Sequence, residues 1–216
     1  FWHVELNNTG TESARYDLIH TQDIGIAHYS AIRLNEYYVS QYIDHSPLFH
    51  PAKGVAIASR QNLSMGGRYP WTIIGSLGSA VSYATDALQF HALSSRAGTV
   101  SVALSKGLPG ARLQHEHSMV CIQDEAIDLK PGQKSTRGFF TWFEDYHPDA
   151  TSDSDLAKID TVLALPEATC PSWPEDVPDS SSAPSLFATA PWLETRDLTK
   201  NETRGFFDDN PQHEET

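Results

Sequence analysis

The sequence predicts an all-β protein. Apolar and polar residues alternate in its front half, as in Trp2, Val4 and Leu6, so that every second side chain faces one side of a pleated strand. Short segments of this kind recur between turns rich in Gly, Pro and Asn, without amphipathic helices between them. This pattern favours a sandwich or barrel over a parallel α/β sheet. At 216 residues, the chain is long enough for one domain with a substantial core.

The expected strands follow one another through the first two-thirds of the chain. The first, at 2–6, ends at an Asn-Asn-Thr-Gly turn, and the second is expected at 16–21. Further strands are expected at 55–60, 71–76, 80–85, 119–129 and 135–143. A Lys-Pro-Gly-Gln turn separates the last two, which suits a hairpin or a corner of a sandwich. We therefore expect a β-sandwich domain over residues 1–165.

Two short helices are expected late in the chain. The first extends from about Ser154 to Leu163, with Asp153 or Ser154 as its N-cap. Its apolar stripe consists of Leu156, Ile159, Val162 and Leu163. The second begins at Thr199, which forms a capping-box pattern with Glu202, and is expected to end near residue 205.

The charge of the chain is concentrated in its last third. Residues 1–142 carry 11 Lys+Arg and 11 Asp+Glu, whereas residues 143–216 carry 4 and 17. Residues 171–185 contain four Pro and five Ser, a composition typical of linkers. We therefore expect residues 166–216 to form an acidic Pro/Ser-rich linker that contains the second helix.

This charge distribution also bears on partners and location. A neutral folded part with an acidic tail has no basic face for phosphates, which argues against nucleic acid or an anionic membrane as partner. No stretch approaches the ~20 apolar residues of a membrane span. The chain begins Phe-Trp-His without a Met or an apolar leader, so we expect a fragment of a longer, cytoplasmic protein.

The densest polar and aromatic block lies at residues 33–45. Aromatic faces cover the C–H patches of sugars while carboxylates and amides bind their hydroxyls, so this block is a candidate saccharide site. Its candidate residues are Arg33, Asn35, Glu36, Tyr37, Tyr38, Gln41, Tyr42 and His45. The same block equally fits an ordinary half-buried strand with Tyr37, Val39 and Gln41 on one face. An ordinary strand is the more frequent explanation of such a pattern.

Other motifs give no assignable chemistry. The run His115-Glu116-His117 and the histidines of 45–50 offer metal-ligand residue types, but structural histidines are far commoner and no metal is expected. Neither the nucleophile-elbow pattern nor the phosphate-loop pattern occurs. Glu36 and Asp44 could be hydroxyl acceptors as well as proton donors, so no catalytic residue is assigned.

Several segments together resemble a known family. They are FWHVELNNTGTESARYDLIHTQDIG, RLNEYYVSQYIDH, ASRQN, PWTIIGSLG and LKPGQ, and NEYYVSQYIDH is the most specific of them. They are similar to the N-terminal sandwich region of the glycoside hydrolase family 94 phosphorylases, above all the β-1,2-oligoglucan phosphorylases and the cyclic β-1,2-glucan synthase type proteins. The resemblance extends over most of residues 1–165, and a Thr-Arg-Asp-Leu motif at 195–198 fits it too.

The resemblance implies a galactose-mutarotase-like β-supersandwich, incomplete at its N-terminus here, followed through a linker by an (α/α)6 barrel beyond residue 216. In such enzymes an acid on the barrel protonates the glycosidic oxygen while inorganic phosphate attacks the anomeric carbon, which is inverted. Phosphate is then a co-substrate, and no cofactor is expected. These enzymes are often homodimers, and the candidate residues of 33–45 would face substrate or a subunit interface.

Three functions follow from these observations. The first is a noncatalytic fragment of a phosphorylase that converts β-linked gluco-oligosaccharides to a sugar 1-phosphate. The second is a carbohydrate-binding or dimerisation module, suggested by aromatic rings on a sandwich surface. The third is a mutarotase-type sugar epimerase, suggested by the His and Glu content of residues 20–50.

Overall fold

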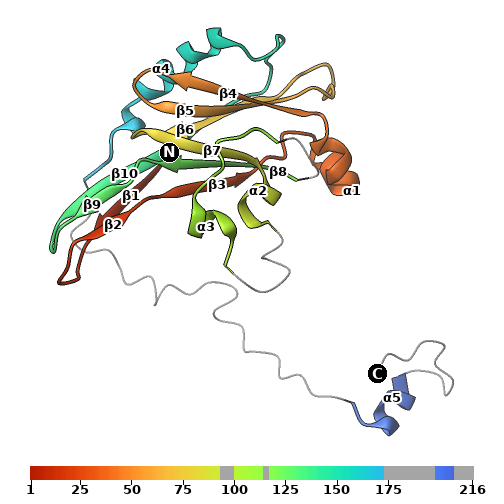
Figure 1. Ribbon diagram of the computed structural model, residues 1–216. Coiled ribbons are helices and arrows are strands. Elements are labelled where there is room, and N and C mark those ends of the chain that lie inside the picture. The colour runs from red at the N-terminus through yellow and green to blue at the C-terminus, as the bar shows by residue number, and fades with distance from the viewer. Residues whose placement is uncertain (93–99, 114–116, 173–197, 207–216) are drawn as a thin grey trace. The chain divides into compact units, whose positions relative to one another are not determined.

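The chain forms two compact units, Phe1–Pro171 and Ser172–Thr216. The computed structural model describes residues 1–92, 100–113, 117–172 and 198–206. The first unit is mostly β, with a few short helices (Figure 1). Within the described residues, no helix is both long enough and apolar enough to cross a membrane.

Eight strands make up the main sheet of the first unit. They are β1 Trp2–Asn7, β3 Ile19–Asp23, β4 Ile43–His50, β5 Gly54–Gln61, β6 Trp71–Ser76, β7 Ala80–Asp86, β8 Ser118–Asp124 and β10 Lys134–Glu144. A separate ribbon pairs β2 Ala14–Tyr16 with β9 Ile127–Leu129. The helices are α1 Tyr29–Ser40, α2 Ala87–His91, α3 Val102–Lys106 and α4 Leu156–Leu163, with 3-10 turns at Asp153–Asp155 and Pro166–Ala168.

The main sheet curls on itself. Its strand order is β1-β10-β6-β5-β7-β8-β3, with β4 paired to β5, and the contact between β5 and β7 is parallel. The curl brings β3 opposite β1 and β10, where the His20 ring lies 4.7 Å from the Trp2 ring and 5.1 Å from the Phe139 ring, centroid to centroid. Thr141 on β10 also donates a hydrogen bond to Gln22 on β3 at 2.9 Å. The all-β, sandwich-like fold is thus confirmed.

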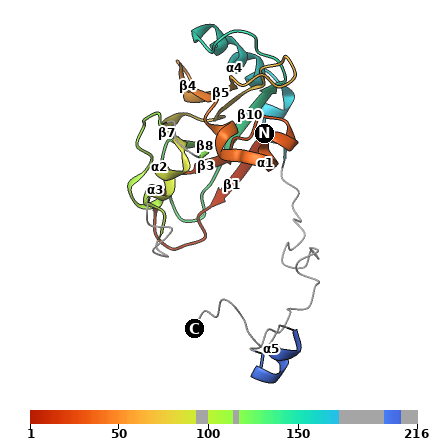
Figure 2. The ribbon, with the colours of Figure 1, turned by 90° about the vertical axis from the view of Figure 1, so that its right-hand side faces the viewer.

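Both faces of the curled sheet are buried at its central strands β5 and β6. Alternate residues of β5 divide between them, since Val55 and Ile57 pack in the inner cluster while Ala56 and Ala58 pack in an outer one. That outer cluster includes Ile159 of α4. A second outer cluster is covered by α2 and α3, which lie across the sheet from α4 (Figures 1 and 2). The sheet therefore needs apolar residues at consecutive positions, as the fully buried β6 has.

Most of the expected strands are confirmed. The strand at 71–76 has the bounds of β6, and 55–60, 80–85 and 135–143 fall within β5, β7 and β10. The expected strands at 16–21 and 119–129 are each divided in two. The two breaks face each other, because β3 pairs with β8 in the main sheet while β2 pairs with β9 in the ribbon.

The late helices are confirmed, with one cap corrected. Ser152 caps the turn before α4, because its backbone N–H bonds the Asp155 carboxylate while its side chain accepts from the Asp155 backbone. In the second unit, α5 spans Lys200–Phe206, and the Glu202 carboxylate accepts from the Thr199 backbone at 2.9 Å as the capping-box pattern predicts. Most of the proline-rich linker lies outside the described residues.

Candidate functional site

The period-two pattern favoured a single strand for the block at 33–45, and this interpretation is wrong. The first part of the block belongs to α1, which is two short helical pieces joined at Asn35, where φ is −162° and ψ is 81°. The Asn35 Oδ1 accepts a hydrogen bond from the Tyr38 backbone N–H at 3.0 Å, so Asn35 acts as the cap of the second piece. The block then enters β4 at Ile43. The change of structure within the block places Tyr37 and Tyr38 on an exposed part of α1 and Tyr42 just after the helix.

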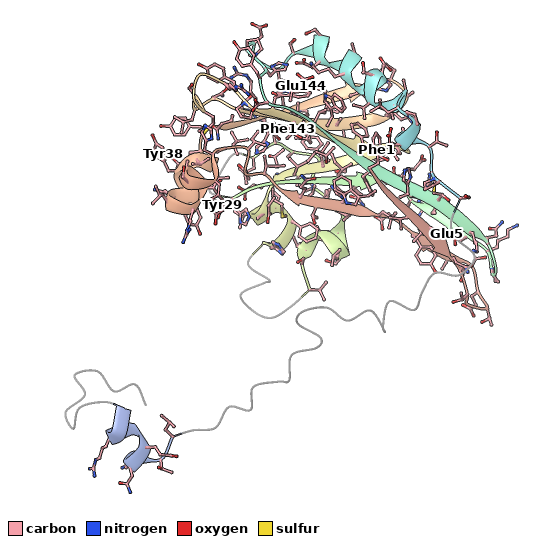
Figure 3. All side chains as sticks on the ribbon, turned by 180° about the vertical axis from the view of Figure 1, so that it is seen from behind. Phe1, Glu5, Tyr29, Tyr38, Phe143 and Glu144 are labelled. Carbon is pink, nitrogen blue, oxygen red and sulfur yellow. The ribbon has the colours of Figure 1, made fainter. Side chains whose placement is uncertain are left out.

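The tyrosines of α1 and of the residues just after it face solvent. Tyr29 is 75% exposed, Tyr37 is 63% exposed and Tyr38 is 47% exposed, and Tyr29 and Tyr38 are labelled in Figure 3. We call Tyr29, Tyr37, Tyr38 and Tyr42 the α1 tyrosine surface. The Tyr42 hydroxyl donates to the Tyr38 hydroxyl at 3.2 Å, and this hydrogen bond raises the pKa of Tyr42. The two rings meet edge to face, with centroids 5.1 Å apart.

The polar candidates divide between the surface and the core. Arg33, Asn35, Glu36 and Gln41 are exposed beside the α1 tyrosine surface. His45 is not part of this group. It is 1% exposed on β4, with its Nδ1 atom 2.8 Å from the Ser59 hydroxyl, and burial lowers its pKa to about 4. The structure therefore brings seven of the eight candidate residues to one surface region and places His45 in the interior.

A cleft of about 440 Å³ lies at the N-terminal end of α1, and the sequence patterns did not point to it. Three segments far apart in the chain line it: the residues before α1, the loop between β5 and β6, and the end of β10. The lining residues are Gly25, Ile26, Ala27, His28, Met65, Gly66, Arg68, Pro70, Phe143 and Asp145. The one local signal was the Gly-Gly pair of the loop, since both glycines have positive φ, 67° at Gly66 and 87° at Gly67.

The cleft combines charged and apolar groups. Arg68 on the loop forms an ion pair with Asp145, the residue directly after β10, and both side chains are more than half exposed. Met65 is buried at 7% exposure, and its sulfur accepts a hydrogen bond from the His28 backbone N–H at 3.4 Å. Phe143 is 54% exposed. A guanidinium with a carboxylate can bind neighbouring hydroxyls, while a ring and a thioether offer an apolar face.

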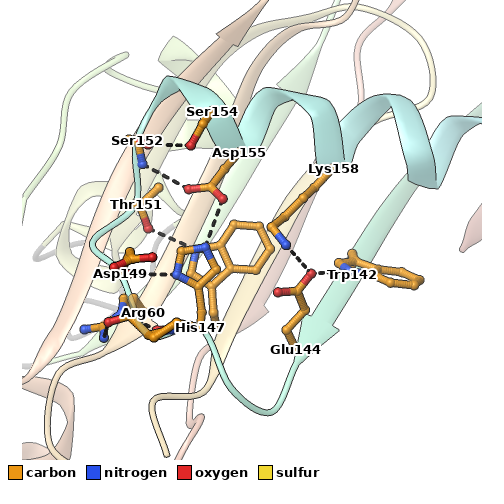
Figure 4. A network of polar contacts seen from close by, with 12 residues as sticks. Arg60, Trp142, Glu144, His147, Asp149, Thr151, Ser152, Ser154, Asp155 and Lys158 are labelled. Atoms are coloured by element: carbon orange, nitrogen blue, oxygen red, sulfur yellow. Dashed lines mark hydrogen bonds and ion pairs between the residues drawn. The ribbon is translucent and has the colours of Figure 1, made fainter.

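A buried polar network holds the chain directly after the cleft (Figure 4). The His147 Nε2 atom lies 2.9 Å from the Asp155 carboxylate, and its ring stacks on Trp71 with centroids 5.0 Å apart. Arg60 donates to the carbonyls of His147 and Pro148 at 2.9 and 2.8 Å. These contacts join the segment after β10 to β5 and β6, and so they hold the β10 end of the cleft in place.

The histidines singled out as metal-ligand types are placed as follows. His115 and Glu116 lie outside the described residues. His117 pairs with Asp23 at 3.2 Å, and His50 pairs with Asp160 at 3.1 Å. The described part of the chain contains no group of three or more His, Cys, Asp or Glu residues that could hold a metal ion.

Two comparisons relate the chain to known proteins. A family model described as the SOGP N-terminal domain matches residues 1–141, which run from the start of the chain into β10. A protein named 1,2-beta-oligoglucan phosphorylase from Listeria innocua serovar 6a is 35% identical over 111 residues, which are 51% of this chain and 10% of that protein. The matched region thus spans only a tenth of the relative's length. Because the family model matches well over half of its residues, this chain belongs to the SOGP N-terminal domain family.

Proposed function

We propose that this chain is the noncatalytic N-terminal sandwich part of a glycoside hydrolase family 94 phosphorylase that acts on β-linked gluco-oligosaccharides. The match of residues 1–141 to the SOGP N-terminal domain carries the proposal. The relative named as an oligoglucan phosphorylase supports the same class of parent protein. The confirmed sandwich-like fold is the scaffold that this role requires.

In the proposed reaction, a phosphate oxygen forms a bond to the anomeric carbon as the glycosidic C–O bond breaks. A carboxylic acid gives its proton to the departing oxygen, so the products are a sugar 1-phosphate and a shortened oligosaccharide. We place the acid and the phosphate site on an (α/α)6 barrel of the same polypeptide, following the family resemblance. A cytoplasmic location and a homodimer belong to the same proposal.

The α1 tyrosine surface would then face saccharide or a subunit interface. Exposed tyrosines suit either role, because each ring has an apolar face and a hydroxyl that can still form hydrogen bonds. The exposed polar side chains of Arg33, Asn35, Glu36 and Gln41 beside it could bind sugar hydroxyls.

A phosphorolysis assay tests the division of roles. This chain, and a longer protein that continues through the barrel, are each incubated with β-1,2-linked gluco-oligosaccharide and phosphate, and sugar 1-phosphate is measured. We expect product from the longer protein alone. Turnover by the 216-residue chain would contradict the noncatalytic role, and an inactive longer protein would contradict the proposed parent activity.

A second candidate is a carbohydrate-binding or dimerisation module without a catalytic parent, and the exposed tyrosines favour it. Calorimetric titration with glucans tests binding at this surface. Saturable heat that is lost in Tyr38→Ala and Tyr42→Ala would support it, and no heat at millimolar sugar would count against it. His45 and Glu36 give the epimerase no support, since His45 is buried in the interior while Glu36 is exposed on α1.

A further inference from the structure

The cleft beside α1 is built from three segments that no single motif connects. Its lining comes from the residues before α1, the loop between β5 and β6, and the end of β10. At about 440 Å³, its volume lies within the usual range of small-molecule sites, about 300–1,000 Å³. Neither the candidate residues of 33–45 nor the family match assigns a role to it.

The charges in the cleft favour a neutral ligand. The positive charge of Arg68 is balanced by Asp145, with which it forms an ion pair. An anion such as phosphate would meet the Asp145 carboxylate as well as the guanidinium, and repulsion from the carboxylate would offset the attraction. Neighbouring hydroxyls suit the pair better, because they can accept from the guanidinium and donate to the carboxylate. Both side chains are more than half exposed, so a ligand can reach them.

The apolar groups in the cleft favour a ligand with a C–H face. Phe143 is 54% exposed near the end of β10, although Phe139 and Phe140 earlier on the same strand are buried. A large exposed ring that lines a cleft is a common way to hold the apolar face of a ligand. Met65 adds a buried thioether to the lining, and it is fixed by hydrogen bonds between its backbone and that of Arg68. Hydroxyl-binding and apolar groups together are what a pyranose ring requires.

The cleft is also held in shape before any ligand arrives. The Met65 and Arg68 backbones exchange hydrogen bonds across the Gly66-Gly67 turn, and the His28 backbone N–H bonds the Met65 sulfur. On the β10 side, the His147 backbone N–H donates to the Tyr69 carbonyl at 2.9 Å, which ties the loop to the segment after β10. A preformed site loses little conformational entropy on binding.

We propose that this cleft binds one glucose ring of a β-linked gluco-oligosaccharide. Arg68 and Asp145 hold two neighbouring hydroxyls of the ring, and Phe143 covers one of its C–H faces. The choice of a gluco-oligosaccharide rests on the proposed function, whereas the choice of a pyranose rests on the groups of the cleft. The cleft is a saccharide site distinct from the α1 tyrosine surface.

The test follows backbone amide NMR signals of the 216-residue chain during titration with sophorose, the β-1,2-linked glucose disaccharide. We expect saturable shifts at 25–28, 65–68 and 143–145. Sorbitol is the control ligand, because it has hydroxyls but no ring face. Arg68→Ala and Phe143→Ala should each weaken binding about fivefold or more, as expected for the loss of a hydrogen-bonding or stacking partner.

Matched controls are available elsewhere on the domain. Arg15 forms an exposed ion pair with Asp128, and Phe49 is 66% exposed on β4, so Arg15→Ala and Phe49→Ala repeat the chemical changes away from the cleft. Neither should change the affinity. Absence of shifts in the cleft with tens of millimolar sophorose would overturn the proposal. Equal shifts with sorbitol, or equal loss of affinity in the control variants, would also overturn it.

The outcome separates this inference from the proposed function. The titration needs neither phosphate nor the barrel, so binding in the cleft can be established even if the longer protein fails to release sugar 1-phosphate. That combination would reject the phosphorylase role and leave a saccharide site. If the longer protein is active but the cleft shows no shifts, the phosphorylase role is supported and the saccharide site is rejected.

Discussion

His45 should make the stability of the domain depend on pH. It is 1% exposed on β4, its Nδ1 atom lies 2.8 Å from the Ser59 hydroxyl, and its buried Nε2 atom has no hydrogen-bond partner in the described structure. Burial is the main reason that its pKa falls from 6.5 to about 4, and the charge of Asp44 opposes the shift. A neutral imidazole is therefore part of the folded state.

The sign and size of the effect follow from linkage. Because the folded pKa lies below the unfolded one, the unfolded chain binds more protons between the two values. The stabilising contribution is thus complete above pH 6.5 and is lost as the pH falls towards 4. At about 1.36 kcal/mol for each pH unit, His45 should cost the domain about 2.5 kcal/mol between about pH 7 and about pH 4.5.

The variant His45→Asn tests this prediction, because an amide can still form a hydrogen bond with Ser59 but does not titrate. Urea unfolding followed by tryptophan fluorescence gives the free energy of unfolding at both pH values. The variant should lose about 2.5 kcal/mol less than the wild type on acidification. His20, whose pKa burial also lowers, is present in both proteins and cancels in the comparison.

His3→Asn is the matched control, since His3 bonds the Glu167 carbonyl near the surface at 2.8 Å. It should leave the acid loss as it is in the wild type. Equal acid losses in wild type and His45→Asn would refute the reasoning, because they would show that the buried imidazole contributes no linkage.

Three further predictions concern packing and accessibility. A Cβ on Gly75 would lie 2.7 Å from the Phe140 ring, so Gly75→Ala should destabilise the domain by about 1–3 kcal/mol in urea unfolding, and an unchanged midpoint would contradict that packing. Asp124 is 1% exposed and its Oδ1 accepts two hydrogen bonds, so Asp124→Ala should cost about 3 kcal/mol in the same assay. Burial raises the pKa of the Cys121 thiol to about 12, so a thiol reagent at neutral pH should label Cys170 in the native protein and Cys121 only after unfolding. Native labelling of both thiols would show that the outer face of β8 is open.

Local patterns were sufficient for much of the fold. The strand at 71–76 has the bounds predicted for a short strand between turn residues, and all of its residues are buried. Helix α4 was predicted because its apolar residues recur at helical spacing, and two of them, Ile159 and Val162, are fully buried. Both signals act over a few residues, so they can be read without knowledge of the partners.

The tyrosine block shows where local patterns failed. Tyrosines favour strands, and a period of two places Tyr37, Val39 and Gln41 on one face of the block, yet α1 forms there with only Val39 and Ser40 buried. Within the described structure, no strand pairs with Tyr29–Ser40, so a strand at these positions would gain no ladder hydrogen bonds. The hydrogen bond from the Tyr38 backbone to Asn35 stabilises a helix that the local sequence pattern did not predict.

The sequence by itself determined most of the strands and helix α4, because their signals are local. The tertiary structure alone decided that His45 enters the core, that the sheet curls, and that a cleft forms beside α1. His28, Arg68 and Asp145 lie in three distant parts of the chain, and they meet because β6 pairs with β10 and the curl brings β3 towards that pair. Contacts of this kind depend on strand pairing over long sequence separations, which no local periodicity encodes.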